Sequence, residues 1–141
     1  MSKAQFPLLE KCKPKNCIVS KTMKINRLMN QLFRKHLSGI DITLSQLSMM
    51  FLISKSEQLA QHRIGEILFL EKSTVTRNLK RLIEGGFVSK KKDKKIHVTL
   101  KGKKLVEKTI PKWEAAMQEA QDKIKKEGKE ALHLLLDKLS N

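Results

Sequence analysis

Apolar residues recur every three or four positions between residues 18 and 37, which is the period of one face of an α-helix. They are Ile25, Leu28, Met29, Leu32, Phe33 and Leu37. A glycine-containing turn at residues 38–41 then ends this helix. A second helix is predicted from Ser45 to Ser54 with Thr43 as its N-cap, and the polar residues 54–61 favour a loop.

Two short helical segments come next, joined by a tight turn at residues 70–72. The apolar residues on one face of the first segment are Ile64, Ile67 and Leu68. Those of the second segment, again at helical spacing, are Val75, Leu79, Leu82 and Ile83. Ser73 or Thr74 is suited to cap the second helix, and Gly85-Gly86 is suited to stop it.

The hydrophobic period changes after Gly86, where apolar and polar residues begin to alternate as they do on short β-strands. The apolar positions are Phe87 and Val88, followed by Ile96, Val98 and Leu100. The polar stretch from Lys90 to Lys95 lies between them and is expected to form a hairpin tip. A small two-stranded β-wing is therefore predicted.

The last third of the chain is predicted to be helical again. One long helix fits residues 101–126, although Pro111 is expected to kink or split it. Gly128 interrupts the pattern before a last short helix whose apolar residues include Leu132, Leu135, Leu136 and Leu139. The predicted fold class is mainly α with a small β-hairpin wing.

Length and composition favour one domain with its own core, because the chain has 141 residues of which 40% are hydrophobic. The sequence contains no apolar run long enough for a membrane span or a signal peptide, so we expect a cytoplasmic protein without a membrane partner. The 30 basic and 14 acidic residues give a net charge of +16. Residues 1–60 carry +7, residues 61–103 carry +8 and residues 104–141 carry only +1, which favours a polyanionic partner for the first two thirds.

The second short helix combines hydroxyl and basic side chains on the face left free by its apolar residues. These are Ser73, Thr74, Thr76, Arg77, Lys80 and Arg81, and no acidic residue occurs between Lys72 and Ile83. Such groups at the start of a helix can reach base edges and phosphates in a DNA groove. Two short helices followed by a lysine-loaded hairpin are the layout of a winged helix-turn-helix, and the second helix is its candidate recognition helix.

The hairpin tip adds further candidate DNA contacts. It contains five lysines and one acid, and the candidates are Lys91, Lys92, Asp93, Lys94 and Lys95. The lysines could follow a phosphate backbone or enter a minor groove, whereas the simpler alternative is a solvated turn. Asp93 is expected to pair with a neighbouring basic residue and shape the wing.

Several motifs together resemble the MarR family of bacterial winged-helix transcriptional regulators. They are the run from Glu71 to Leu82, Gly86-Phe87-Val88, Asp93-Lys94-Lys95, and the run from Val98 to Lys103. The resemblance implies a single domain over residues 1–141, with a DNA-binding winged helix-turn-helix at 43–103 and dimerisation helices at 18–40 and 104–141. A departure is that lysines follow Asp93 where the family usually has arginines, which makes minor-groove insertion less secure than backbone contact.

A homodimer is expected on two grounds. The terminal helices carry more apolar surface than one helix pair readily hides, and the resemblance implies the same assembly. A two-fold dimer would place two recognition helices one helical turn apart, which matches a palindromic operator.

Two further groups of residues have open roles. Cys12 and Cys17 lie among lysines that favour the reactive thiolate, so they are either a redox switch or ordinary reduced thiols. Zinc is disfavoured because no second Cys or His pair has suitable spacing. The resemblance implies a ligand pocket near the dimer helices, with Met29, Phe33, His36 and Met50 as candidates, although their spacing alone indicates core residues.

An enzyme is not expected, because the chain lacks a phosphate-binding loop, a nucleophile elbow and a zinc-deaminase signature, and no cofactor is implied. The favoured function is a sequence-specific DNA-binding regulator, most simply a repressor, whose DNA affinity responds to a small ligand or to thiol oxidation. The alternatives are a non-specific architectural DNA-binding protein and a basic interaction module.

Overall fold

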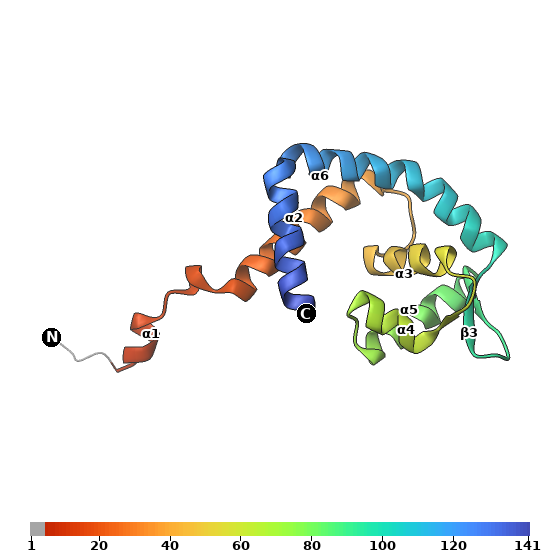
Figure 1. The fold of residues 1–141 in the computed structure, drawn as a ribbon, viewed down its shortest axis with the longest axis horizontal. Coiled ribbons are helices and arrows are strands. Elements are labelled where there is room, and N and C mark those ends of the chain that lie inside the picture. The colour runs from red at the N-terminus through yellow and green to blue at the C-terminus, as the bar shows by residue number, and fades with distance from the viewer. Residues whose placement is uncertain (1–4) are drawn as a thin grey trace.

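A computed structural model describes residues 5–141, and its elements form a winged helix beneath a long C-terminal helix (Figure 1). In chain order the elements are α1 (Pro7–Lys11), the 3₁₀ turn η1 (Pro14–Asn16), α2 (Ile18–His36), α3 (Leu44–Lys55), β1 (Leu59–Ala60), α4 (Gln61–Leu68), α5 (Lys72–Glu84), β2 (Val88–Lys90), β3 (Lys95–Val98) and α6 (Leu100–Ser140). The predicted fold class, mainly helical with a small β-wing, is confirmed. Among the described residues, no helix is both long and apolar enough to cross a membrane.

The first two predicted helices form where expected, as α2 and α3. Thr43 is the N-cap of α3, and it forms a capping box with Gln46. The Thr43 hydroxyl accepts a hydrogen bond from the Gln46 backbone N–H at 3.1 Å, while the Gln46 side-chain oxygen accepts one from the Thr43 backbone N–H at 3.2 Å. This reciprocal pair satisfies two backbone donors at the start of α3 and fixes where the helix begins.

The sheet has three antiparallel strands in the order β1-β3-β2 rather than the two predicted. The strand that was missed, β1, lies inside the segment 54–61 that was predicted as a loop, and Leu59 pairs with Ile96 of β3. A strand of two residues is too short to show an alternating pattern. The prediction was also wrong at Leu100, which begins α6 instead of ending β3, because Thr99 accepts a hydrogen bond from the Gly102 backbone N–H and caps the helix.

Helix α5 has the predicted amphipathic character with two corrections. It begins at Lys72 after Glu71, so Ser73 and Thr74 lie inside its first turn and do not cap it. Ile83, predicted on the packed face, is 41% exposed, whereas the polar Asn78 is buried and donates a hydrogen bond to the Ser45 hydroxyl of α3 at 3.2 Å. The hydrogen bond allows an amide to occupy a buried position.

Helix α6 continues through Pro111, contrary to the predicted kink or split there. The helix is held by packing on both sides of the proline: Thr109 is buried, and Trp113 packs edge-on against Phe51 of α3 with ring centroids 5.3 Å apart. The sharp turn in Figure 1 comes later, at Lys125, whose φ of 61° and ψ of −171° are not helical. The break is therefore three residues before Gly128, where the sequence indicated it.

The core lies between α3, α5 and the sheet, with α4 and the start of α6 closing it. Its buried apolar members include Met49, Met50, Ile53, Leu59, Ile64, Val75, Leu79, Leu82, Val88, Ile96 and Val106. Because the apolar residues Val75, Leu79 and Leu82 of α5 enter this core, the opposite face of α5 is directed outward. The packing of the core thus orients the candidate recognition helix.

Gly102 allows α6 to approach this core closely. A Cβ atom at this position would stand 2.1 Å from the Phe87 carbonyl oxygen and 2.8 Å from a methyl carbon of Val98. The first of these neighbours is backbone, which cannot rotate out of the way. No residue larger than glycine fits here without separating α6 from the sheet.

We therefore predict that Gly102→Ala destabilises the protein by about 2–4 kcal/mol, since the added methyl group overpacks a rigid site. Urea denaturation followed by circular dichroism measures the loss. Lys103→Ala, an exposed change in the same turn of α6, is the matched control and should alter the free energy of unfolding by less than about 0.5 kcal/mol. Equal stability of Gly102→Ala and the parent would contradict the close approach of α6.

Candidate nucleic-acid interface

The outward face of α5 gathers most of the predicted base-reading residues. Ser73, Thr76, Arg77, Lys80 and Arg81 are exposed, and Thr74 is half-buried. No carboxylate of α5 lies between its first residue and Ile83, so the partial positive charge of the helix N-terminus and the basic side chains act in the same direction. This face can offer hydroxyl, guanidinium and ammonium groups to a polyanion.

One residue of this face is engaged by a neighbour that the sequence did not reveal. The Thr76 hydroxyl donates to the Lys72 carbonyl oxygen at 2.9 Å and accepts from the Gln61 side-chain amide at 3.2 Å. The side-chain oxygen of Gln61 in turn accepts a hydrogen bond from the Lys90 ammonium at 3.2 Å. Gln61 thus connects α4, α5 and the wing, and no sequence pattern marks such a role for a single glutamine.

The wing tip is a tight turn closed by backbone and side-chain hydrogen bonds. The Lys94 backbone N–H donates to the Lys91 carbonyl at 2.9 Å, and Lys94 has a φ of 62°. Asp93 accepts from the Lys95 backbone N–H at 2.9 Å, and this hydrogen bond is the main cause that lowers the pKa of the Asp93 carboxyl. Asp93 therefore shapes the turn, chiefly through a backbone N–H.

The tip lysines are not equivalent. Lys91, Lys92 and Lys94 are exposed, and they extend the basic surface beyond α5. Lys95 is half-buried, and its ammonium donates to the Gln58 side chain at 2.8 Å. The three exposed lysines are thus better placed than Lys95 to contact a phosphate backbone.

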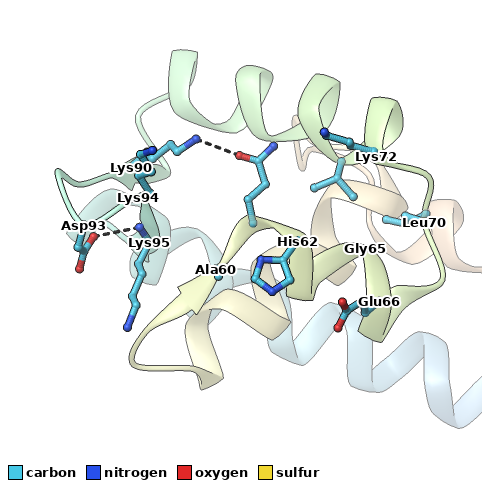
Figure 2. Close-up of a pocket in the computed structure, with 12 residues that line it drawn as sticks. Ala60, His62, Gly65, Glu66, Leu70, Lys72, Lys90, Asp93, Lys94 and Lys95 are labelled. Atoms are coloured by element: carbon cyan, nitrogen blue, oxygen red, sulfur yellow. Dashed lines mark hydrogen bonds between the residues drawn. The ribbon is translucent and has the colours of Figure 1, made fainter.

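A groove of about 820 Å³ separates the wing from α4 and the start of α5 (Figure 2). Lys90, Lys94 and Lys95 line its wing side, and Lys72 lines its other side at the beginning of α5. Only two carboxylates, Asp93 and Glu66, are among its lining residues. The groove joins the two basic surfaces, α5 and the wing, into one candidate interface.

The sequence of this region matches a model of the MarR family over residues 40–95, which run from just before α3 to the first residue of β3. The resemblance to the MarR family is confirmed. A comparison with curated protein sequences finds no match.

Three solved structures share the fold over nearly the whole chain. A structure of Bordetella bronchiseptica BpsR is 16% identical with a TM-score of 0.80, covering 92% of this chain and 97% of its own. The Mycobacterium tuberculosis regulator MosR is 23% identical with a TM-score of 0.77, covering 91% and 98%. The reduced form of Escherichia coli MarR is 21% identical with a TM-score of 0.69, covering 94% and 98%. The MarR-like fold therefore includes the terminal helices α2 and α6.

The four residues suggested as pocket candidates by the MarR resemblance do not meet at the cavity between α2 and α6. A cavity of about 610 Å³ lies between α2 and α6, and of the four only Met29 lines it. Met50 is fully buried in the core of the winged helix. His36 contacts Glu119 of α6, and Phe33 is half-buried on α2 outside the lining of this cavity.

The two cysteines occupy the ends of neighbouring elements. Cys12 follows α1, Cys17 precedes α2, and η1 lies between them. Both thiols are exposed and free. Their redox role stays a prediction. Within residues 5–141, no group of three or more His, Cys, Asp or Glu side chains is arranged to hold a metal ion.

Charged residues tie α2 to α6 beside the cavity. The Lys35 ammonium lies 2.6 Å from one Glu119 oxygen, and the His36 ring contacts the other. These hydrogen bonds, that of Lys35 first, lower the pKa of the Glu119 carboxyl below its ordinary value of 4.5. A carboxyl with a lowered pKa in the folded state stabilises that state above its unfolded pKa.

We predict that Glu119→Gln lowers stability at pH 7 and that this difference shrinks as the pH falls through the lowered pKa of Glu119. At more acid pH the parent carboxyl is protonated too, so parent and variant should converge. Thermal unfolding measured between pH 7 and pH 3 tests this, with Glu114→Gln, an exposed change on the same helix, as control. A Glu119→Gln deficit that persists unchanged at the acid end would contradict the ion-pair account.

Proposed function

We propose that the protein is a homodimeric, sequence-specific DNA-binding transcriptional regulator of the MarR type. The observation that carries this proposal is the outward face of α5, which presents hydroxyl and basic side chains without a carboxylate and is connected to the lysine-bearing wing through Gln61. Support comes from the MosR structure in complex with DNA, which is 24% identical with a TM-score of 0.72. By occupying an operator, the dimer would act most simply as a repressor.

In this proposal, α5 enters the major groove and the wing follows the phosphate backbone. Arg77 can form the paired hydrogen bonds that guanine offers in the major groove, whereas Lys91, Lys92 and Lys94 supply point charges to phosphates. Base contacts discriminate between sequences, and phosphate contacts raise affinity for all of them. The helix and the wing therefore make separable contributions.

We predict that Arg77→Ala lowers affinity for the preferred site by about 1–3 kcal/mol and reduces discrimination between sites. Replacing the three exposed wing lysines Lys91, Lys92 and Lys94 with alanine should instead weaken all duplexes similarly and flatten the salt dependence by roughly 0.9 in log-log slope per lost phosphate contact. Fluorescence anisotropy titrations across a salt series, each variant serving as the control for the other, measure both effects.

An unchanged salt slope in the wing variant would exclude the wing from phosphate contact. An unchanged site preference in Arg77→Ala would exclude base reading by that residue. A parent protein that binds every duplex equally would favour the architectural alternative, and a parent that binds anionic vesicles but not DNA would favour a basic interaction module.

The homodimer is supported by apolar surface that one chain leaves uncovered. None of the α2 residues is buried, and Ile18, Val19 and Leu28 are each more than 60% exposed. Residues 129–141 are all exposed, including Leu134, Leu136 and Leu139. Apolar surface of this extent on two adjacent helices is typical of an interface, and a second copy of the same helices is the partner that a two-fold dimer supplies.

We predict that deletion of residues 129–141 converts the dimer to a monomer. Because these residues are exposed in the single chain, their removal leaves the winged-helix core intact, and circular dichroism should still report a folded protein. Sedimentation velocity of parent and truncated protein at equal concentration measures the change. A truncated chain that still sediments as a dimer would place the interface elsewhere.

Regulation of DNA affinity by a small molecule or by thiol oxidation is the remaining part of the proposal. The solved BpsR structure is described as regulated in its DNA binding by 6-hydroxynicotinic acid, and CouR, 13% identical with a TM-score of 0.80, is described as bound to p-coumaroyl-CoA. In this chain, either signal would act through α2. Cys17 directly precedes this helix, and Met29 of the same helix lines the cavity between α2 and α6. A shift of α2 in the dimer would change the spacing of the two recognition helices.

We predict that peroxide weakens DNA binding of the parent through oxidation of Cys12 and Cys17. Neither thiol lies on α5, so oxidation would act by shifting α2 and thereby changing the spacing of the two recognition helices. The double variant Cys12→Ser and Cys17→Ser should lose this response while binding DNA normally in its absence. Anisotropy titrations before and after peroxide treatment compare the two proteins. An equal response of parent and variant would remove the cysteines from the account.

A further inference from the structure

Gln61 is the first residue of α4, and its side chain contacts two elements that are distant in sequence. Its carbonyl oxygen accepts a hydrogen bond from Lys90, the last residue of β2, and its amide nitrogen donates one to Thr76 of α5. The Thr76 hydroxyl in turn donates a hydrogen bond to the Lys72 carbonyl oxygen. The dashed line to Lys90 in Figure 2 marks the hydrogen bond of this series that crosses the groove.

The chemistry of this position requires a side-chain amide. Lys90 can only donate, so its partner must accept, while the Thr76 hydroxyl already uses its hydrogen on Lys72, so its second partner must donate. Glutamine offers an acceptor oxygen and a donor nitrogen at the end of a single side chain. A glutamate would keep the bond to Lys90 but could not donate to Thr76, and a methionine of similar shape would keep neither.

The hydrogen bonds determine what Thr76 and Lys90 can offer to DNA. With its hydrogen committed to Lys72, the Thr76 hydroxyl cannot donate to a base acceptor, and the methyl group is the part of this exposed side chain without a polar partner. A methyl group suits contact with the thymine methyl in the major groove. The Lys90 side chain reaches across the groove to Gln61 at the start of α4.

We propose that Gln61 is a positioning residue for DNA recognition: it sets the orientation of Thr76 on the recognition helix and holds the wing strand β2 toward that helix through Lys90. The inference rests on the proposed DNA-binding function and deepens it. Gln61 itself lies on α4, and it acts through Thr76 and Lys90.

The hydrogen bonds of the Gln61 side chain lie at the surface, where they contribute little to the free energy of unfolding. Thr76 and Lys90 are exposed, and Gln61 is only half-buried, so water can replace each partner when the side chain is changed. Loss of these bonds should therefore leave stability almost unchanged, while it frees Lys90 and leaves the Thr76 hydroxyl held by its bond to Lys72 alone. This separation of stability from recognition distinguishes positioning from a merely structural role.

The experiment compares Gln61→Met and Gln61→Glu with the parent on two DNA probes. One probe is the duplex that the parent protein enriches most from a random library, and the other is a scrambled duplex of equal length. Gln58→Met is the matched control, because the Gln58 side chain also accepts a hydrogen bond from a wing lysine, Lys95, but within the described residues it forms none to α5. The readouts are the ratio of the two dissociation constants and the melting temperature.

We expect Gln61→Met to reduce the discrimination ratio roughly three- to tenfold, the range that corresponds to the loss of one or two modest hydrogen bonds, at an unchanged melting temperature. Gln61→Glu, which keeps the bond to Lys90, should lose less. Gln58→Met should retain the parent ratio. In the background of Thr76→Val, which removes the hydroxyl and keeps a methyl group, Gln61→Met should have a smaller effect than in the parent, because the two side chains act together.

The inference is overturned if Gln61→Met keeps the parent ratio, if its loss of binding follows a lower melting temperature, or if Gln58→Met causes the same loss of discrimination. It is also overturned if the effects of Gln61→Met and Thr76→Val are independent. A parent protein that enriches no duplex overturns the proposed function itself, and this result is distinguishable because it appears before any variant is tested.

Discussion

The burial of one face of α5 is the packing interaction on which the candidate interface depends. Val75, Leu79 and Leu82 enter the core, and Asn78 is held beside them by its hydrogen bond to Ser45 of α3. A helix fixed by four contacts over two turns cannot rotate about its axis without exposing apolar surface. The hydroxyl and basic residues on the opposite face are therefore presented outward by the same packing that stabilises the winged helix.

The remaining elements place this helix relative to its surroundings. Gly102 brings α6 against the sheet, and Glu119 joins α6 to α2 through Lys35 and His36. Gln61 links α5 to the wing. The terminal helices leave apolar surface uncovered. If a second copy packs on this surface, the terminal helices determine how the two α5 helices are spaced, although they lie far from the candidate DNA interface. In the proposed dimer, a movement of α2 would change DNA binding without any direct contact between α2 and DNA.

Much of the fold could be predicted from the sequence because its signals are local. The apolar period of α5, the Thr43 cap and the change of period after Gly86 each act over a few residues. The two-residue strand β1 and the continuation of α6 through Pro111 could not be predicted, because strand pairing with β3 and the packing on both sides of Pro111 are long-range effects. The candidate site likewise contains residues that local patterns predict and one residue that they do not.

The outward residues of α5 follow from helical periodicity, whereas the role of Gln61 depends on partners 15 and 29 residues away. The central claim is that two α5 helices of a dimer read DNA. A hydroxyl-radical footprint of the parent protein on its most enriched duplex tests this claim most directly. The account predicts two protected segments related by two-fold symmetry, with centres about 10 base pairs or a whole number of helical turns apart. Uniform protection along the duplex, or a single unpaired segment, would contradict it.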